Sequence, residues 1–261
     1  MMLWKKIAIT CRCVPPYEKP CPDTRECSSF VALTVAPKMA METKSDLQEL
    51  AGKLNPTIGY FEPLGLVDGN FWGETDSATI GFLREAEIKH GRIAMFAFVG
   101  FCSGSAGIHW PWAIDTAGTP FPVANGVPGA QWDALSLSAK IQIIGFVLIM
   151  ELWSEGARSA HYMRGGKAGA FPSFKDSEIE LPHPVPFDLF DPFGFSKKAS
   201  ETKKAEGLLK EINNGRLAMI GIMGLCAESK VEGAVPLLAG KVAHYDGDYM
   251  QPFEGAFSFF S

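Results

Sequence analysis

The stretch EIKHGRIAMFAFVG, Glu87–Gly100, decides the fold because it joins a charged turn to an apolar run. Four of its first six residues can carry charge, and the apolar run after the charged turn covers only Ile93–Cys102. A helix that crosses a bilayer needs about 20 apolar residues, so a spanning helix here has to include the charged turn. Hydropathy alone therefore leaves a buried helix of a soluble protein equally open.

A second stretch, EINNGRLAMIGIMG at Glu211–Gly224, repeats the first at seven of fourteen positions. The similarity extends upstream, where FEPLGL (Phe61–Leu66) precedes the first copy and FDPFGF (Phe190–Phe195) precedes the second. Each unit is therefore an acidic-proline turn followed by a helix with a polar first turn. Two such helices can run in the same direction through a membrane only if an odd number of spans lies between them.

Charge in the connecting segments supports three spans, at about residues 78–107, 136–155 and 203–228. Residues 103–139 contain no Lys or Arg, whereas residues 154–210 contain nine. Basic loops stay on the side of synthesis, and Trp residues gather at membrane interfaces; Trp110, Trp112 and Trp132 all lie in the Lys-free segment. We expect an all-α membrane protein whose first and third helices cross as a pseudo-twofold pair, with short amphipathic helices added.

Residues 1–40 are predicted to be a leader or an N-terminal tail, and residues 41–261 the folded domain. The first residues are basic and poor in acids, as in targeting segments. Four of the six cysteines lie in the first 27 residues, but their spacing fits no standard metal site. The net charge of −5 argues against nucleic acid as a partner.

An α-helix advances about 100° around its axis per residue, and this angle indicates which charged residues of the motif can pair. Glu87 and His90 lie about 60° apart on one face, whereas Arg92 lies about 140° from Glu87. An unpaired charge in a bilayer costs several kcal/mol. In two crossing copies, Arg92 can pair with Glu211 and Arg216 with Glu87, so we expect these two ion pairs.

The side chains left on that face can each act as a single ligand to a metal. Glu87, His90, Glu211 and Asn214 offer oxygen or nitrogen lone pairs but form no cage of several ligands. Single axial ligands suit a metal that a macrocycle already holds, and magnesium favours oxygen donors. These residues therefore predict chlorophyll magnesium sites. A stripe of Gly and Ala on both helices would allow a close crossing and leave room for flat ligands, although ordinary packing explains the stripe equally well.

The paired motifs, with their acidic-proline turns, resemble the light-harvesting chlorophyll-binding proteins of plastids over residues 55–253. Segments such as GAQWDAL and HPVPFDLFDPFGF are most similar to the chlorophyll a/c antennas of dinoflagellates and diatoms. The resemblance implies a multi-pass thylakoid protein that binds chlorophyll a, chlorophyll c and carotenoids of the peridinin or fucoxanthin type and the diadinoxanthin type. It implies membrane lipids, neighbouring antenna proteins and a photosystem core, preferably photosystem I, as partners.

The same resemblance implies further pigment-binding residues. Gln142 and Glu151 on the middle helix match ligand-type positions, although Gln142 could simply bond a neighbour and Glu151 could lie at the interface. Glu228 at the end of the third helix could hold another chlorophyll, but no arginine of the repeat is available to neutralise it. The turns Glu62-Pro63 and Asp191-Pro192 resemble loops that hold carotenoid head groups.

Two other functions compete with the antenna. A photoprotective protein that converts excitation to heat would use the same fold and ligands. A membrane di-iron enzyme is a remote alternative, since Glu-x-x-His is half of such a site; the second copy, however, has Asn214 in place of His, and an arginine follows in both copies. We therefore expect no enzymatic activity.

Overall fold

The computed structural model describes residues 42–69, 75–174, 190–195 and 198–253, and this part of the chain is helical without strands. The predicted leader or tail, residues 1–40, lies outside these ranges. The elements, in chain order, are α1 (Lys44–Leu54), η2 (Val67–Gly69), α2 (Asp76–Ser105), η3 (Ala124–Gly126), α3 (Pro128–Asp133), α4 (Leu137–Gly156), η4 (Tyr162–Arg164) and α5 (Glu201–Lys230). The long helices α2, α4 and α5 cover most of the residues of the three expected spans, and the amphipathic α1 precedes them.

Hydroxyl side chains define where the long helices begin. Thr75, Ser136 and Ser200 each precede a long helix and accept a hydrogen bond from the backbone N–H three residues later. Such N-caps satisfy one of the free donors of the first turn. The start of each predicted helix is therefore set locally, by its own sequence.

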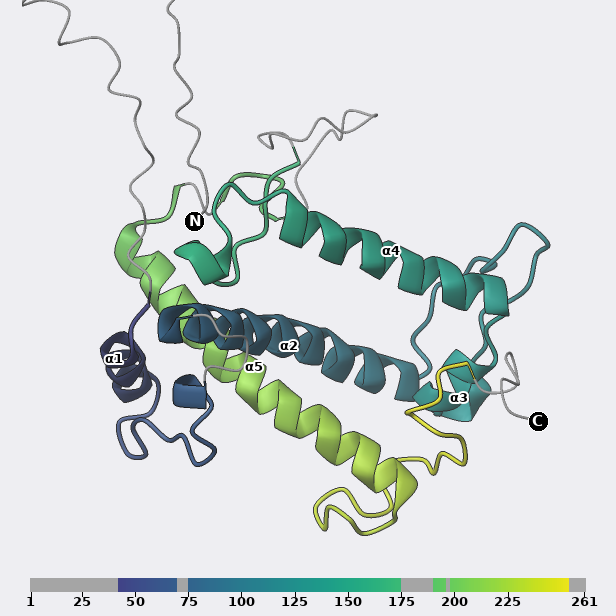
Figure 1. Ribbon diagram of the computed structural model, residues 1–261. Helices are drawn as coiled ribbons and strands as arrows, with labels where there is room; N and C mark the ends of the chain where they lie inside the picture. Colours follow the sequence, from purple (N-terminus) through teal and green to yellow (C-terminus); the bar gives the residue numbers. More distant parts are fainter. Residues whose placement is uncertain (1–41, 70–74, 175–189, 196–197, 254–261) are drawn as a thin grey trace, which may run out of the picture. The chain divides into compact units, whose positions relative to one another are not determined.

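The centre of the fold is the crossing of α2 and α5, which pack against each other more extensively than any other pair of described elements (Figure 1). The two backbones meet at Gly91 and Gly215, which occupy the same position in the two copies of the repeat. A Cβ atom added to Gly215 would lie 2.9 Å from the Gly91 Cα. The close approach that the stripe of small residues allows is therefore used here.

Helix α4 is exposed along its length rather than packed in a protein core. By length and composition it is the one helix in the described ranges that could cross a membrane, with a mean hydropathy of 1.5. Its exposed large apolar side chains are Leu137, Ile141, Ile143, Ile144, Phe146, Val147, Leu148, Ile149 and Leu152. Helices α2 and α5, with 30 residues each, are long enough to span but less apolar, because each carries its polar turns.

The segment after α4 is held against α2 by an ion pair and a hydrogen bond to Glu85. Arg158 Nη2 lies 2.6 Å from Glu85 Oε1, and both side chains are almost fully buried. Glu85 also accepts a 2.6 Å hydrogen bond from the backbone N–H of Gly169. At Gly81 of α2 a Cβ atom would lie 2.4 Å from the Tyr162 carbonyl oxygen, so η4 sits directly on the helix backbone.

At the other end of the bundle, the chain that follows α5 returns to α3. The Tyr245 hydroxyl donates to Asp133 at 2.8 Å, and its ring covers Gly129. Ser229 at the end of α5 bonds both the Tyr245 backbone N–H and the Tyr249 hydroxyl. These contacts fix the end of α5 beside α3.

Candidate functional site

The polar turns of the two repeats meet at the helix crossing and exchange charges. Arg92 Nε lies 2.6 Å from Glu211 Oε1, and Arg216 Nε lies 2.7 Å from Glu87 Oε1. In each pair the arginine belongs to one helix and the glutamate to the other, as the helical geometry predicts. All four side chains are partly exposed, so the pairs lie at the edge of the crossing rather than inside it.

Glu87 has a second cation that the repeat does not predict. Arg84 Nη1 lies 2.6 Å from Glu87 Oε2, and Arg84 Nε lies 3.5 Å from Glu42 Oε2. The Arg84 side chain is 7% exposed, so this arginine is held inside the protein. The matching position of the second copy is Leu208, and the pseudo-twofold symmetry is therefore broken at Glu87.

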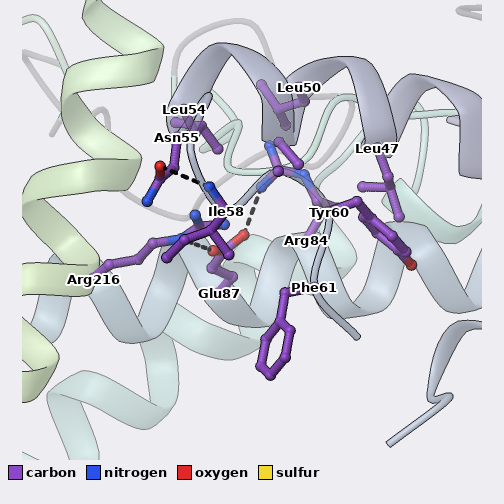
Figure 2. A pocket seen from close by; sticks show the side chains of 12 residues that line it. Leu47, Leu50, Leu54, Asn55, Ile58, Tyr60, Phe61, Arg84, Glu87 and Arg216 are labelled. Carbon is purple, nitrogen blue, oxygen red and sulfur yellow. Dashed lines mark hydrogen bonds and ion pairs between the residues drawn. The ribbon is translucent and has the colours of Figure 1, made fainter. Parts of the chain in front are cut away.

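A cavity of about 340 Å³ opens beside Glu87 (Figure 2). Figure 2 shows the Glu87 carboxylate between Arg84 and Arg216, with the leucine side chains of α1 above them. The apolar side chains that line the cavity belong to α1 and to the chain that follows α1, and they are Leu47, Leu50, Leu54, Ile58 and Phe61. The lining is about equally polar and apolar, and its polar side chains are those of Asn55, Tyr60, Arg84, Glu87 and Arg216.

His90 presents one free ring nitrogen. Its Nδ1 lies 2.7 Å from the Ala86 carbonyl oxygen, which can only accept, so Nδ1 carries the proton. The neutral ring then keeps its lone pair on Nε2, on an exposed side chain. A hydrogen bond of this kind fixes the tautomer and orientation of metal-binding histidines.

The other predicted ligands differ in the hydrogen bonds and ion pairs that their side chains make. Asn214 and Gln142 are exposed, and their side chains make no hydrogen bond with the described part of the chain. Glu151 is also exposed, but its Oε2 lies 2.6 Å from Lys89 Nζ of α2. The structure thus gives Glu151 a cation that helix spacing within α4 did not predict.

Glu228 lies in a closed environment at the end of α5. Its side chain is almost fully buried. Oε1 accepts a hydrogen bond from the Gly233 backbone N–H at 2.9 Å, and Oε2 accepts one from Val235 at 2.8 Å. Backbone N–H groups of the following segment therefore bind Glu228, for which no arginine of the repeat is available.

The two acidic-proline turns share some features, although Asp191 has a positive φ and Glu62 does not. The Glu62 carboxylate accepts hydrogen bonds from the Tyr60 hydroxyl and, at 2.5 Å, from the Val67 backbone N–H. Asp191 Oδ1 accepts one from the Phe195 backbone N–H at 2.6 Å. Gly65 and Gly194, three residues after the acids, both have positive φ, and the residues before them, Leu64 and Phe193, are exposed. Pro63 and Pro192 are exposed as well.

The Tyr60–Glu62 contact also affects ionisation outside the helices. Burial, together with the hydrogen bond to Glu62, raises the pKa of the Tyr60 hydroxyl to about 12. The hydroxyl therefore stays protonated at physiological pH and remains a donor to Glu62. Tyr60 is also one of the residues that line the cavity beside Glu87.

Most of the chain, including both copies of the repeat, matches a known protein family. A model of the family described as "Chlorophyll A-B binding protein" matches residues 46–230, which include both copies of the repeat and α4. The chain belongs to this family. The match confirms the resemblance read from the two motifs, and the family consists of light-harvesting antenna proteins rather than enzymes.

Individual relatives are about 30% identical to the chain over the aligned residues. A fucoxanthin-chlorophyll a-c binding protein of Trieres chinensis is 33% identical over 186 residues, covering 70% of this chain and 79% of that protein. Protein F of the same description, from Phaeodactylum tricornutum, is 31% identical over 200 residues, with 76% and 84% covered. The light-harvesting complex stress-related protein 3.2 of Chlamydomonas reinhardtii is 29% identical over 204 residues, with 76% and 70% covered.

Proposed function

We propose that this protein is a light-harvesting antenna apoprotein of the plastid thylakoid membrane that holds chlorophylls and carotenoids for excitation transfer to a photosystem. The observation that carries the proposal is the crossing itself. Two glutamates are neutralised by arginines of the opposite helix, and each stands three residues before a side chain with an unused lone pair, His90 or Asn214. Bound chlorophyll would supply light absorption and transfer of excitation.

The residues present fit magnesium ligation. Glu211 uses Oε1 for Arg92, and Glu87 uses one hydrogen bond per oxygen, so both retain acceptor capacity. We assign Glu87, His90, Glu211 and Asn214 as ligands around the crossing, and Gln142 and Glu151 on α4. Glu228 is proposed as a further ligand, and it is the least accessible of the set because the segment after α5 buries it.

The acidic-proline turns are proposed to hold carotenoid head groups. Their internal hydrogen bonds through Glu62 and Asp191 keep the turns closed, while the residues of the turns that point outward are apolar. The names of the relatives from diatoms support chlorophyll a, chlorophyll c and a fucoxanthin-type carotenoid. A peridinin-type or diadinoxanthin-type carotenoid would use the same turns.

A multi-pass arrangement of α2, α4 and α5 agrees with the charges and aromatic residues of the connections. The segment between α2 and α4 has no Lys or Arg, and its Trp110 and Trp112 stack at 4.9 Å while both remain more than 60% exposed. Exposed indole rings suit a membrane interface. The names of the relatives support a plastid location and say nothing of photosystem I or II, so the expected preference for photosystem I rests on the sequence resemblance alone.

The proposal is tested by assembling the full chain with a pigment extract from an alga that contains chlorophylls a and c. We expect a stable complex whose excitation spectrum includes chlorophyll c and carotenoid bands when chlorophyll a emission is recorded. Chromatography of the extracted pigments then gives their identities and ratios. A chain that binds no chlorophyll under conditions in which a fucoxanthin-chlorophyll protein assembles would contradict the proposal.

Replacing His90 by alanine should remove one chlorophyll per chain and leave the complex assembled. His90 is exposed and bonds only its own helix, at Ala86, among the described residues, so the fold does not depend on it. Pigment-to-protein ratios measure the loss. His109, a loop histidine stacked on Phe121, provides the matched control, and its alanine variant should keep the full complement. Full pigmentation of His90→Ala would refute the ligand assignment.

A photoprotective role is the second candidate, and the stress-related relative is the observation that favours it. An antenna should keep a long chlorophyll fluorescence lifetime at both neutral and acidic pH, whereas a quencher that responds to acid should show a shorter lifetime at pH 5. Acids are scarce between α2 and α4, where Asp115 and Asp133 occur. Hydrogen bonds from Thr119 lower the pKa of Asp115, so it stays ionised at pH 5, and we expect no shortening.

A further inference from the structure

Lys89 is the residue of the first repeat that reaches away from the crossing, toward α4. Its Nζ lies 2.6 Å from Glu151 Oε2 and 3.1 Å from Glu155 Oε1. It also donates to the Ser154 hydroxyl at 3.1 Å. One lysine of α2 therefore contacts three side chains on one turn of α4, with only 26% of its own side chain exposed.

Helix α4 has no cation of its own near Glu151. Its single basic residue is Lys140, eleven positions earlier and thus roughly 16 Å away along the axis. Lys140 donates instead to the Asp133 carbonyl oxygen. Arg158, just after the helix, forms an ion pair with the buried Glu85 instead. Among the described residues, Lys89 is the cation in contact with Glu151.

Glu151 thus has the same arrangement as Glu211 at the crossing, whereas Glu87 also has Arg84 at its second oxygen. In all three, a cation from another helix contacts one carboxylate oxygen: Arg216 for Glu87, Arg92 for Glu211 and Lys89 for Glu151. The Oε1 atom of Glu151 makes no hydrogen bond with the described residues. A neutralised carboxylate with one oxygen to spare is what a magnesium ligand in apolar surroundings requires.

The corresponding residue of the second repeat makes a parallel contact on the other side. Asn213 Nδ2 lies 3.4 Å from the Leu54 carbonyl oxygen, at the end of α1. In both copies the third residue of the motif therefore reaches from the crossing to the neighbouring helix, α4 in one case and α1 in the other. Lys89 is charged and Asn213 is neutral because Lys89 contacts carboxylates of α4, whereas Asn213 contacts a backbone carbonyl of α1.

We propose that Lys89 is a positioning residue for pigment binding by α4: it neutralises Glu151 and holds that carboxylate so that its free oxygen can ligate a chlorophyll magnesium. Lys89 itself does not contact the metal. The inference rests on the proposed function, in particular on Glu151 as a ligand. It explains why a lysine stands inside the polar turn although neither ion pair of the crossing uses it.

The test compares chlorophyll-to-protein ratios after assembly of full-length variants with a chlorophyll a/c pigment extract. Glu151→Ala should bind one chlorophyll fewer per chain, and Lys89→Met should lose the same pigment, identified by the same missing band in the absorption difference spectrum. Lys89→Arg should keep it. The double variant Lys89→Met/Glu151→Gln should regain it, because a glutamine can ligate without a counter-charge.

Lys53→Met is the matched control, since Lys53 is an exposed lysine that pairs with Glu49 within α1 at 2.6 Å. It should keep every pigment. Full pigmentation of Glu151→Ala would refute the ligand and with it this part of the proposed function. Loss in Glu151→Ala with no loss in Lys89→Met would refute the role of Lys89 alone. If Lys89→Met fails to assemble and the double variant fails as well, Lys89 has only a structural role and the inference is wrong.

Discussion

Replacing Arg92 by alanine is expected to abolish assembly of the pigmented complex, and to do so more completely than replacing Arg216. Among the described residues, Arg92 is the cation that contacts Glu211. Glu87, in contrast, keeps Arg84 at 2.6 Å when Arg216 is removed. Removing one partner of a buried ion pair costs about 3–5 kcal/mol, and the partial exposure of Glu211 reduces this figure in the free chain. In the assembled complex, pigment and lipid cover Glu211, and the full cost of leaving it unpaired applies again.

The measurement is the yield of chlorophyll-containing complex after assembly, for the wild type, Arg92→Ala and Arg216→Ala in parallel. We expect almost none for Arg92→Ala and a reduced but measurable yield for Arg216→Ala. The double variant Arg92→Ala/Glu211→Gln serves as the control, because it removes both charges and leaves an amide oxygen at the ligand position. It should recover much of the yield. Equal yields for the two single variants would mean that Arg84 does not support Glu87.

The reciprocal pairing could be predicted from the sequence because it depends only on helix periodicity and on two copies of one motif. The angle between Glu87 and Arg92 is fixed within a single helix, and the repeat supplies the second helix. The positions of the long helices were predictable for a similar reason, since hydroxyl caps and apolar runs are local signals. These features need no knowledge of how the remaining chain packs.

Other parts of the site are not predicted by the repeat, and most of them depend on how the helices pack. Arg84 precedes the motif, and its counterpart in the second copy is Leu208, so alignment of the repeats hides it. The contact of Lys89 with Glu151 requires that α4 lie beside α2, which the segment after α4 sets through Arg158 and Glu85. The backbone donors that hold Glu228 come from a turn that follows the helix. The contacts of Lys89 and Glu228 have no local signature, whereas Arg84 lies three residues before Glu87 on the same helix, a spacing that predicts an ion pair.

Replacing Gly215 by valine should separate the crossed helices and so disrupt both ion pairs at once. A Cβ atom there would lie 2.9 Å from the Gly91 Cα, and a helix backbone cannot move aside as a flexible side chain could. Overpacking of this kind costs about 1–3 kcal/mol. Here it also moves each arginine away from the glutamate of the opposite helix, since the pairs at 2.6 and 2.7 Å span the same crossing.

Gly207, on the same helix, separates this effect from the general effect of adding a side chain to a helical glycine. A Cβ atom at Gly207 meets nothing within 4 Å. Gly207→Val should therefore match the wild type in pigment yield and in the temperature at which the visible circular dichroism of the complex is lost. Gly215→Val should lower both, with a decrease of roughly 2–12 °C in that temperature for the destabilisation given above. If both variants behave alike, the glycine contact does not set the distance between the helices, and the ion pairs must hold the crossing together by themselves.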